Sequence, residues 1–255
     1  MIYAQEITYT KEQIQVKLDS IREEANILFR LESASWKTTD LINEIGIDYK
    51  KLGGYTTYIS NDSVKTIFVS KEKDMVMAEV VFVEEFEDPV VEKLLPRSLK
   101  KNEEELFLVR DRLIDQLMTK DYGITIPNGY NFNFITIPFG SFYKTYMILG
   151  SEDAKIIPFG NDFMFVTDNK GEIISHQRFH MSFIPAQTAF EDKIITRCMH
   201  SHVKSSPFIS ATDICTFKLY APFSSITSFS VYSSALDMTF VYDLKTDLIS
   251  VEISD

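Results

Sequence analysis

The sequence contains little cysteine and an excess of acidic over basic side chains, and each of these features excludes a class of protein. Only two cysteines occur in 255 residues and no Cys-x-x-Cys pair is present, which excludes a disulfide framework and a four-cysteine zinc site. Lysine and arginine number 26 against 37 aspartates and glutamates, so the net charge is −11. Such a surface repels phosphate groups, and we expect no binding to nucleic acid.

The sequence also lacks a long apolar run. No stretch of eighteen apolar residues occurs, which argues against a transmembrane helix. Residues 1–13 have neither the basic region nor the apolar region of a secretion signal. The negative charge further disfavours an anionic membrane surface. We therefore expect a cytoplasmic protein that does not bind membranes.

Several common functional motifs are missing as well. The chain contains no G-x-x-x-x-G-K-[ST], no G-x-G-x-x-G, no H-E-x-x-H and no G-x-S-x-G. Phosphate-binding loops, dinucleotide folds, zincin proteases and α/β-hydrolases therefore have no support in the sequence.

What the sequence does contain, near its start, is a helical pattern. Residues 10–13 read T-K-E-Q, a capping box, and apolar residues follow at alternating spacings of four and three, which predicts a helix over residues 10–31. A shorter helix is predicted to begin at residue 39 or 40 and to end before Gly53 and Gly54.

The pattern then changes to an alternation of apolar and polar residues. This alternation predicts a meander of three strands between residues 55 and 83. Asn102 and Glu105 form a second capping box, which predicts a helix over residues 103–120.

The composition shifts after residue 121. Fifteen of the twenty phenylalanines lie beyond Gly129, and helical periodicity becomes rare, so this half is predicted to be mainly β. The turn sequence D-N-K-G at residues 168–171 predicts a hairpin that leads into a strand over residues 172–183. We predict an α+β protein in two parts: residues 1–121, an α+β region of unknown role, and residues 122–255, a β-rich domain.

The histidines are clustered, which fold building does not require. All four lie between His176 and His202. His200 and His202 end an apolar run, and alternate residues of a strand point to one face, so both imidazoles can bind the same cation. Asp213 would supply an oxygen ligand. Two histidines and one carboxylate leave a fourth coordination position open, which is typical of catalytic zinc.

The string from His200 to Asp213, H-S-H-V-K-S-S-P-F-I-S-A-T-D, resembles the motif of the MPN/JAMM zinc metalloproteases, a family that includes isopeptidases. The resemblance implies that His200, His202 and Asp213 bind zinc. It also implies that the hydroxyl of Ser210 stabilises the oxyanion formed when zinc-bound water attacks an amide carbonyl. An MPN-like α/β fold over residues 122–255 and a protein or peptide substrate follow from the same resemblance.

The chain departs from the family pattern at two places. Val203 stands where the family usually has proline. The family's general base is a glutamate on an early strand, but residues 141–150 contain no acid, and Glu152 is the nearest substitute, followed by Glu172. Two functions therefore stay open: a zinc-dependent amide or isopeptide hydrolase with Glu152 as its base, or a catalytically inactive binding or scaffold module, MPN-like or unrelated.

Other features near the motif also have two interpretations. The S-x-x-D pattern of residues 210–213 is itself a capping box, which predicts a helix over residues 212–220 whether or not metal binds. Cys198 shares a strand face with the two motif histidines and is either a thiolate ligand or an inert core thiol. His176 and His180 share a face of the predicted strand, where they either orient the metal ligands or are exposed to solvent.

Overall fold

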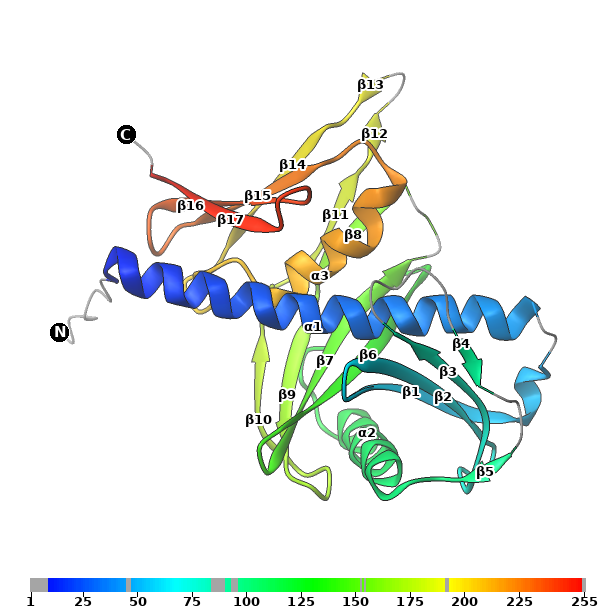
Figure 1. Ribbon diagram of the computed structural model, residues 1–255. Coiled ribbons are helices and arrows are strands. Elements are labelled where there is room, and N and C mark those ends of the chain that lie inside the picture. Colours follow the sequence, from blue (N-terminus) through cyan, green and yellow to red (C-terminus); the bar gives the residue numbers. More distant parts are fainter. Residues whose placement is uncertain are drawn as a thin grey trace.

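The computed structural model describes residues 9–44, 47–83, 90–92, 96–151, 153, 155–190 and 193–253. Its helices and largely antiparallel sheets give an α+β fold, in agreement with the sequence. Figure 1 shows the long helix α1 running across the middle of the molecule. The sheet of β14–β17 and the short pairs β8–β11 and β12–β13 lie on one side of it, and the other two sheets lie on the opposite side.

Helix α1, Lys11–Glu44, begins as the sequence predicts and ends much later. The backbone N–H of Thr10 donates to Oε1 of Gln13 at 2.9 Å, and the N–H of Gln13 donates to Oγ1 of Thr10 at 3.2 Å, which confirms the capping box. The predicted interruption after residue 31 is wrong. Buried Ser35 and Thr38 satisfy their hydroxyls by donating to carbonyls four residues earlier, so polar residues continue the helix.

The first sheet is the predicted meander. Its strands are antiparallel, and two short strands also pair with β3. The elements are η1 Tyr49–Lys51, β1 Leu52–Ser60, β2 Ser63–Ser70, β3 Met75–Phe82, β4 Val90–Glu92 and β5 Arg97–Ser98. Gly53 and Gly54 lie within β1, so the prediction that they end a helix is wrong.

Helix α2, Lys101–Thr119, packs on the side of the first two sheets that faces away from α1 (Figure 1). The predicted helix is confirmed, but its cap is not the one predicted: the N–H of Lys100 donates to Oε2 of Glu103 at 2.7 Å, in place of an Asn102–Glu105 box. Leu106 packs against the first sheet and Leu113 against the second, so the helix joins the two.

The second sheet has the strand order β10-β9-β7-β6, and its neighbours are all antiparallel. A separate two-stranded sheet pairs β8 with β11, and β12 pairs with β13. The strands are β6 Tyr130–Phe139, β7 Phe142–Ser151, β8 Ile156–Gly160, β9 Phe163–Thr167, β10 Ile173–Arg178, β11 Phe183–Gln187, β12 Ala189–Phe190 and β13 Lys193–Ile194.

The third large sheet contains one parallel pair. Strands β14 and β15 are parallel, and helix α3 connects them; β16 and β17 continue the sheet antiparallel. The elements are β14 Arg197–His202, α3 Ala211–Tyr220, η3 Ala221–Phe223, β15 Ser228–Ser233, β16 Met238–Asp243 and β17 Leu248–Ile253.

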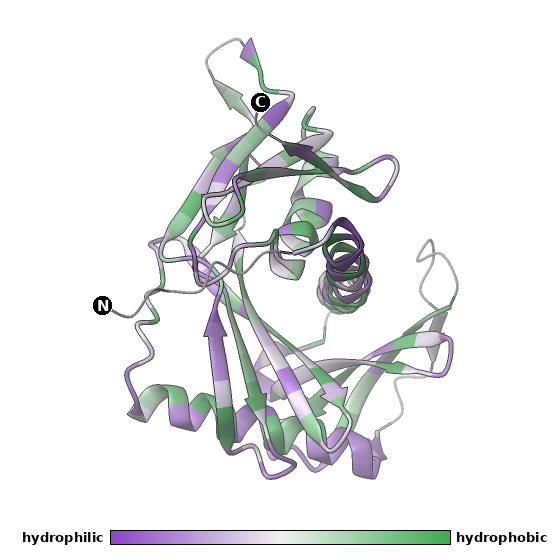
Figure 2. Ribbon diagram, turned by 90° about the vertical axis from the view of Figure 1, so that its left-hand side faces the viewer, coloured by the Kyte–Doolittle hydropathy of each residue, from purple (hydrophilic) through white to green (hydrophobic). Residues whose placement is uncertain are grey.

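The largest apolar cluster joins the two halves of the sequence. Leu28 of α1, Tyr146 of β7 and Phe217 of α3 belong to it, together with Phe229 of β15. In Figure 2, which looks nearly along α1, the helix lies between the sheets. The predicted division at residue 121 stays a prediction. Residues from both sides of that position pack together in this cluster. No helix in the described ranges combines the length and apolarity needed to cross a membrane.

Candidate metal centre

Four buried side chains converge beside the N-terminus of α3: His180, His200, His202 and Asp213. One ligand atom from each lies within 4.8 Å of the others. The side chains are between 0 and 4% exposed. Three of these residues are those predicted from the sequence, and His180 is an addition.

Strand β14 supplies two of the imidazoles. His200 and His202 point to the same side, as strand alternation predicts, and both are buried. Nε2 of His200 lies 3.3 Å from Oδ1 of Asp213, and Nε2 of His202 lies 3.1 Å from Oδ2 of the same carboxylate. The ring of His200 packs against Phe159 and Phe229, which fixes its orientation.

Asp213 both caps α3 and faces the imidazoles. Ser210 is the N-cap: its Oγ accepts from the N–H of Asp213 at 3.0 Å, and its own N–H donates to Oδ2 of Asp213 at 3.0 Å. The predicted capping box is therefore confirmed. It leaves Oδ1 of Asp213 buried with no hydrogen-bond partner among the described residues, on the side where His180 and His200 lie. A buried anionic oxygen without a donor is a position at which a cation would be stabilised.

His180 reaches the cluster because the predicted strand over residues 172–183 is interrupted. Strand β10 ends at Arg178 and β11 begins at Phe183, so residues 179–182 form a bend. Nε2 of His180 lies 2.7 Å from Nε2 of His202, 3.3 Å from Nε2 of His200 and 3.3 Å from Oδ1 of Asp213. The expectation that His176 and His180 share a strand face is therefore wrong.

His176 lies elsewhere. It is exposed on β10, where its ring contacts Tyr122 and Phe165. The clustering of four histidines within 27 residues pointed to this region, but only the bend after Arg178 decides which of the two upstream histidines enters the centre.

Hydrogen bonds behind the cluster determine which imidazole nitrogens face inward. Nδ1 of His180 donates to Oδ1 of Asp162 at 2.6 Å, and Oδ2 of Asp162 accepts from the hydroxyl of Thr212. Nδ1 of His202 donates to the carbonyl of Phe208 at 2.6 Å. Because a carboxylate and a carbonyl can only accept, both neutral imidazoles carry their proton on Nδ1 and present the Nε2 lone pair to the centre. Such partners commonly fix metal-binding histidines.

The two inward lone pairs of His180 and His202 would repel each other at 2.7 Å, so a positive charge has to lie between or on them. A proton serves this purpose when no metal is bound. Burial lowers the pKa of His180, but the carboxylates of Asp162 and Asp213 outweigh burial and raise that pKa to about 9. Burial raises the pKa of Asp213, but His180, His200 and His202 hold it well below its usual value.

The spacing of the donor atoms is that of a tetrahedral site. Four ligands about 2.0–2.1 Å from one ion lie about 3.3–3.4 Å from each other. The distances that join His180, His200 and Asp213 are each 3.3 Å, whereas those from His202 are shorter, 3.1 Å to Oδ2 of Asp213 and 2.7 Å to His180. The residues present therefore fit a zinc-sized ion with little rearrangement.

The sequence offered Glu152 and Glu172 as candidate bases. Glu152 lies outside the described residues. Glu172 is exposed in the hairpin turn, at the opposite end of β10 from His180, where its N–H donates to Asp168. Cys198 is half-buried against the main core, and burial raises the pKa of its thiol to about 12, which favours the core-thiol interpretation over a thiolate ligand.

Comparisons with protein-family models, with curated proteins and with solved structures found no match to this chain. Its function is therefore inferred from the geometry of the site.

The cap on α3 gives a first testable prediction. Replacing Ser210 by Ala removes the acceptor for the N–H of Asp213, and we expect the free energy of unfolding to fall by about 1 kcal/mol. Thermal melts in the presence of a chelator would measure this loss separately from any effect on metal. Ser201→Ala, at an exposed position of β14, is the matched control; equal melting temperatures for the two variants would contradict the prediction.

Proposed function

We propose that the chain binds one zinc ion through His180, His200, His202 and Asp213. The observation that carries the proposal is the set of 3.3 Å spacings, together with the carboxylate oxygen that has no donor. Three imidazoles and one carboxylate are the ligand types that zinc takes in proteins. The same set disfavours magnesium and calcium, which prefer oxygen ligands almost exclusively.

Four protein ligands favour a structural rather than a catalytic role. A catalytic zinc site keeps one position for water or substrate, and His180 occupies the position that the His200, His202 and Asp213 set alone would leave open. The ion would connect strand β14, the N-terminus of α3 and the bend at residues 179–182, three segments that are separate in sequence. We therefore propose a metal-stabilised binding or scaffold module as the function that the site supports best.

A zinc-dependent amide or isopeptide hydrolase is the second candidate, and one observation favours it. His200 and His202 lie on a strand, and Ser210 and Asp213 begin a helix, as expected for the motif that resembles the MPN/JAMM proteases. In that function Ser210 would orient the carboxylate of Asp213, to which its hydroxyl donates at 2.7 Å. The hydrolase would need His180 to leave the ion, and it would act on a protein or peptide.

Metal analysis and an activity assay separate the two functions. Protein purified without a histidine tag should contain close to one zinc per chain, and cobalt substitution should give the intense visible absorption of a four-coordinate site. We expect no hydrolysis of peptide or isopeptide substrates. Less than a tenth of an equivalent of metal after incubation with zinc would contradict the metal proposal, whereas turnover that disappears in Asp213→Asn would favour the hydrolase.

A further inference from the structure

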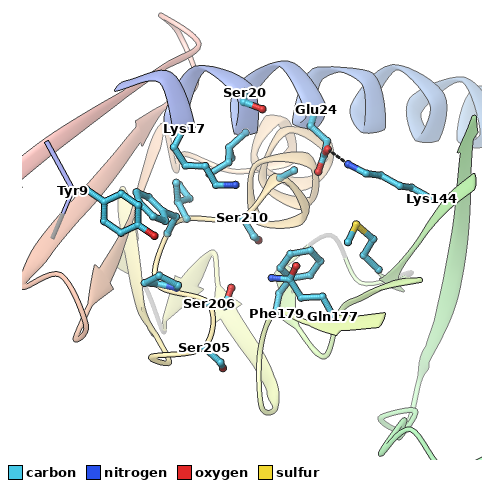
Figure 3. A pocket seen from close by; sticks show the side chains of 16 residues that line it. Tyr9, Lys17, Ser20, Glu24, Lys144, Gln177, Phe179, Ser205, Ser206 and Ser210 are labelled. Carbon is cyan, nitrogen blue, oxygen red and sulfur yellow. Dashed lines mark hydrogen bonds and ion pairs between the residues drawn. The ribbon is translucent and has the colours of Figure 1, made fainter. Parts of the chain in front are cut away.

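A cavity of about 420 Å³ lies between the first half of α1 and the loop that leads into α3. Figure 3 shows its side chains: Lys17, Ser20 and Glu24 enter from α1, and Ser206 and Ser210 lie opposite. The volume is in the range of small-molecule sites. The cavity adjoins the candidate metal centre, because two of its lining residues, Phe179 and Ser210, are next to candidate ligands: Phe179 precedes His180, and Ser210 caps Asp213. None of the four candidate metal ligands lines the cavity.

The charge of the lining is opposite to that of the whole protein. Its charged residues are Lys17, Lys144 and Glu24, two cations against one anion, in a chain whose net charge is −11. Nζ of Lys144 is paired with Glu24 at 2.8 Å, as the dashed line in Figure 3 marks. Among the described residues no carboxylate pairs with Lys17, whose ammonium extends into the cavity. An occupant with one negative charge would find a partner there.

The rest of the lining has both apolar and hydrogen-bonding parts. Phe179, Phe208 and Ile209 give the cavity a buried apolar wall. Ser206 is 6% exposed, and no hydrogen bond of its hydroxyl is found within the described ranges. An occupant that suits this wall combines apolar side chains, groups that hydrogen-bond with hydroxyls and one carboxylate. A peptide that ends in apolar residues has all three.

The cavity wall is also held in place by the candidate metal ligands. The carbonyl of Phe208 accepts from His202 at 2.6 Å, and Ser210 is joined to Asp213 by three hydrogen bonds. The loop that forms the wall is therefore fixed before any ligand arrives, which lowers the entropic cost of binding.

We propose that this cavity binds the carboxyl terminus of a peptide with apolar final residues, and that Lys17 pairs with the terminal carboxylate. The proposal extends the suggested role as a binding module, but it depends on the cavity and not on the identity of the metal.

Isothermal titration calorimetry with N-acetyl-leucyl-leucine and with its C-terminal amide would test the proposal, because the two probes differ only in the terminal group, a charged carboxylate in one and a neutral amide in the other. We expect the acid to bind about tenfold more tightly, as a charge-assisted hydrogen bond is gained. In Lys17→Gln the two affinities should become equal, while Lys11→Gln, an exposed lysine on the same helix outside the cavity, should keep the difference.

Equal affinities of acid and amide for the unmodified protein, or no heat from either probe at millimolar concentration, would overturn the proposal. Tighter binding of decanoate, which has the carboxylate without amide groups, would overturn the peptide assignment. Zinc content measured on the same samples keeps this test separate from the metal proposal: a full zinc equivalent without peptide binding rejects the cavity site alone.

Discussion

The His202→Ala variant is expected to lose its metal and to melt about 10 °C below the unmodified protein. An ion that binds only the folded state stabilises it by about 4 kcal/mol when the free metal is a thousand times the dissociation constant. In a chain of this size 1 kcal/mol corresponds to about 2–4 °C. A strong chelator should lower the melting temperature of the unmodified protein by a similar amount and leave the variant unchanged, which differential scanning calorimetry would measure.

His176→Ala is the matched control, because it removes the one histidine that lies outside the centre on an exposed position of β10. This variant should keep its metal and its response to the chelator. If the chelator leaves the melting temperature of the unmodified protein unchanged, no structural ion is bound at this site.

The second large effect is expected at Glu32, a carboxyl group buried in the middle of α1 with 1% exposure. Burial raises the pKa of Glu32 from its ordinary value of 4.5 to about 7, although hydrogen bonds from Trp36 and Asn133 lower it. The unfolded chain ionises this group from pH 4.5, whereas the folded chain keeps its proton until about pH 7. The contribution of Glu32 to the free energy of unfolding is therefore fully present below pH 4.5, and about 3 kcal/mol of it is lost as the pH rises from 4.5 to 7.

Glu32→Gln removes this loss because the amide keeps the size and the polarity without the charge. We expect the variant to match the unmodified protein at pH 4.5 and to be more stable by about 3 kcal/mol at pH 8. Urea unfolding at both pH values would measure the difference, with Glu23→Gln, an exposed position on the same helix, as control. An equal gain at the two pH values would show that ionisation of Glu32 is not the cause.

Local patterns predicted the elements that depend on neighbouring residues. The meander and the body of α2 follow from the period of apolar residues, the T-K-E-Q box gives the start of α1, and the S-x-x-D box placed Ser210 at the start of α3. The continuation of α1 through residues 31–44 did not follow, because it depends on contacts from elsewhere. The hydroxyl of Ser35, for example, lies 2.7 Å from that of Thr57 on β1, and no pattern within the helix contains this partner.

His180 shows the same limit within the candidate centre. The sequence R-F-H-M-S has no glycine or proline to indicate a bend. The bend is held by distant groups: the N–H of Phe179 donates to the carbonyl of Asp162, and the N–H of Asn161 donates to that of Ser182. Strand alternation was sufficient to bring His200 and His202 together, but the fourth member requires contacts between residues about twenty positions apart.

The position of α1 also has a consequence for how the chain acquires its structure during synthesis. Asn26 donates to a carboxylate oxygen of Asp247 at 2.8 Å, across 221 residues of sequence, and the apolar face of α1 packs on α3 and on the sheets of both halves. At ribosomal rates of about 5–20 residues per second, α1 exists for about 10–40 s before Asp247 has been made. During that interval the apolar face of α1 lacks its final partners, so the packing of the core can be completed only after the strands of the last sheet have been made.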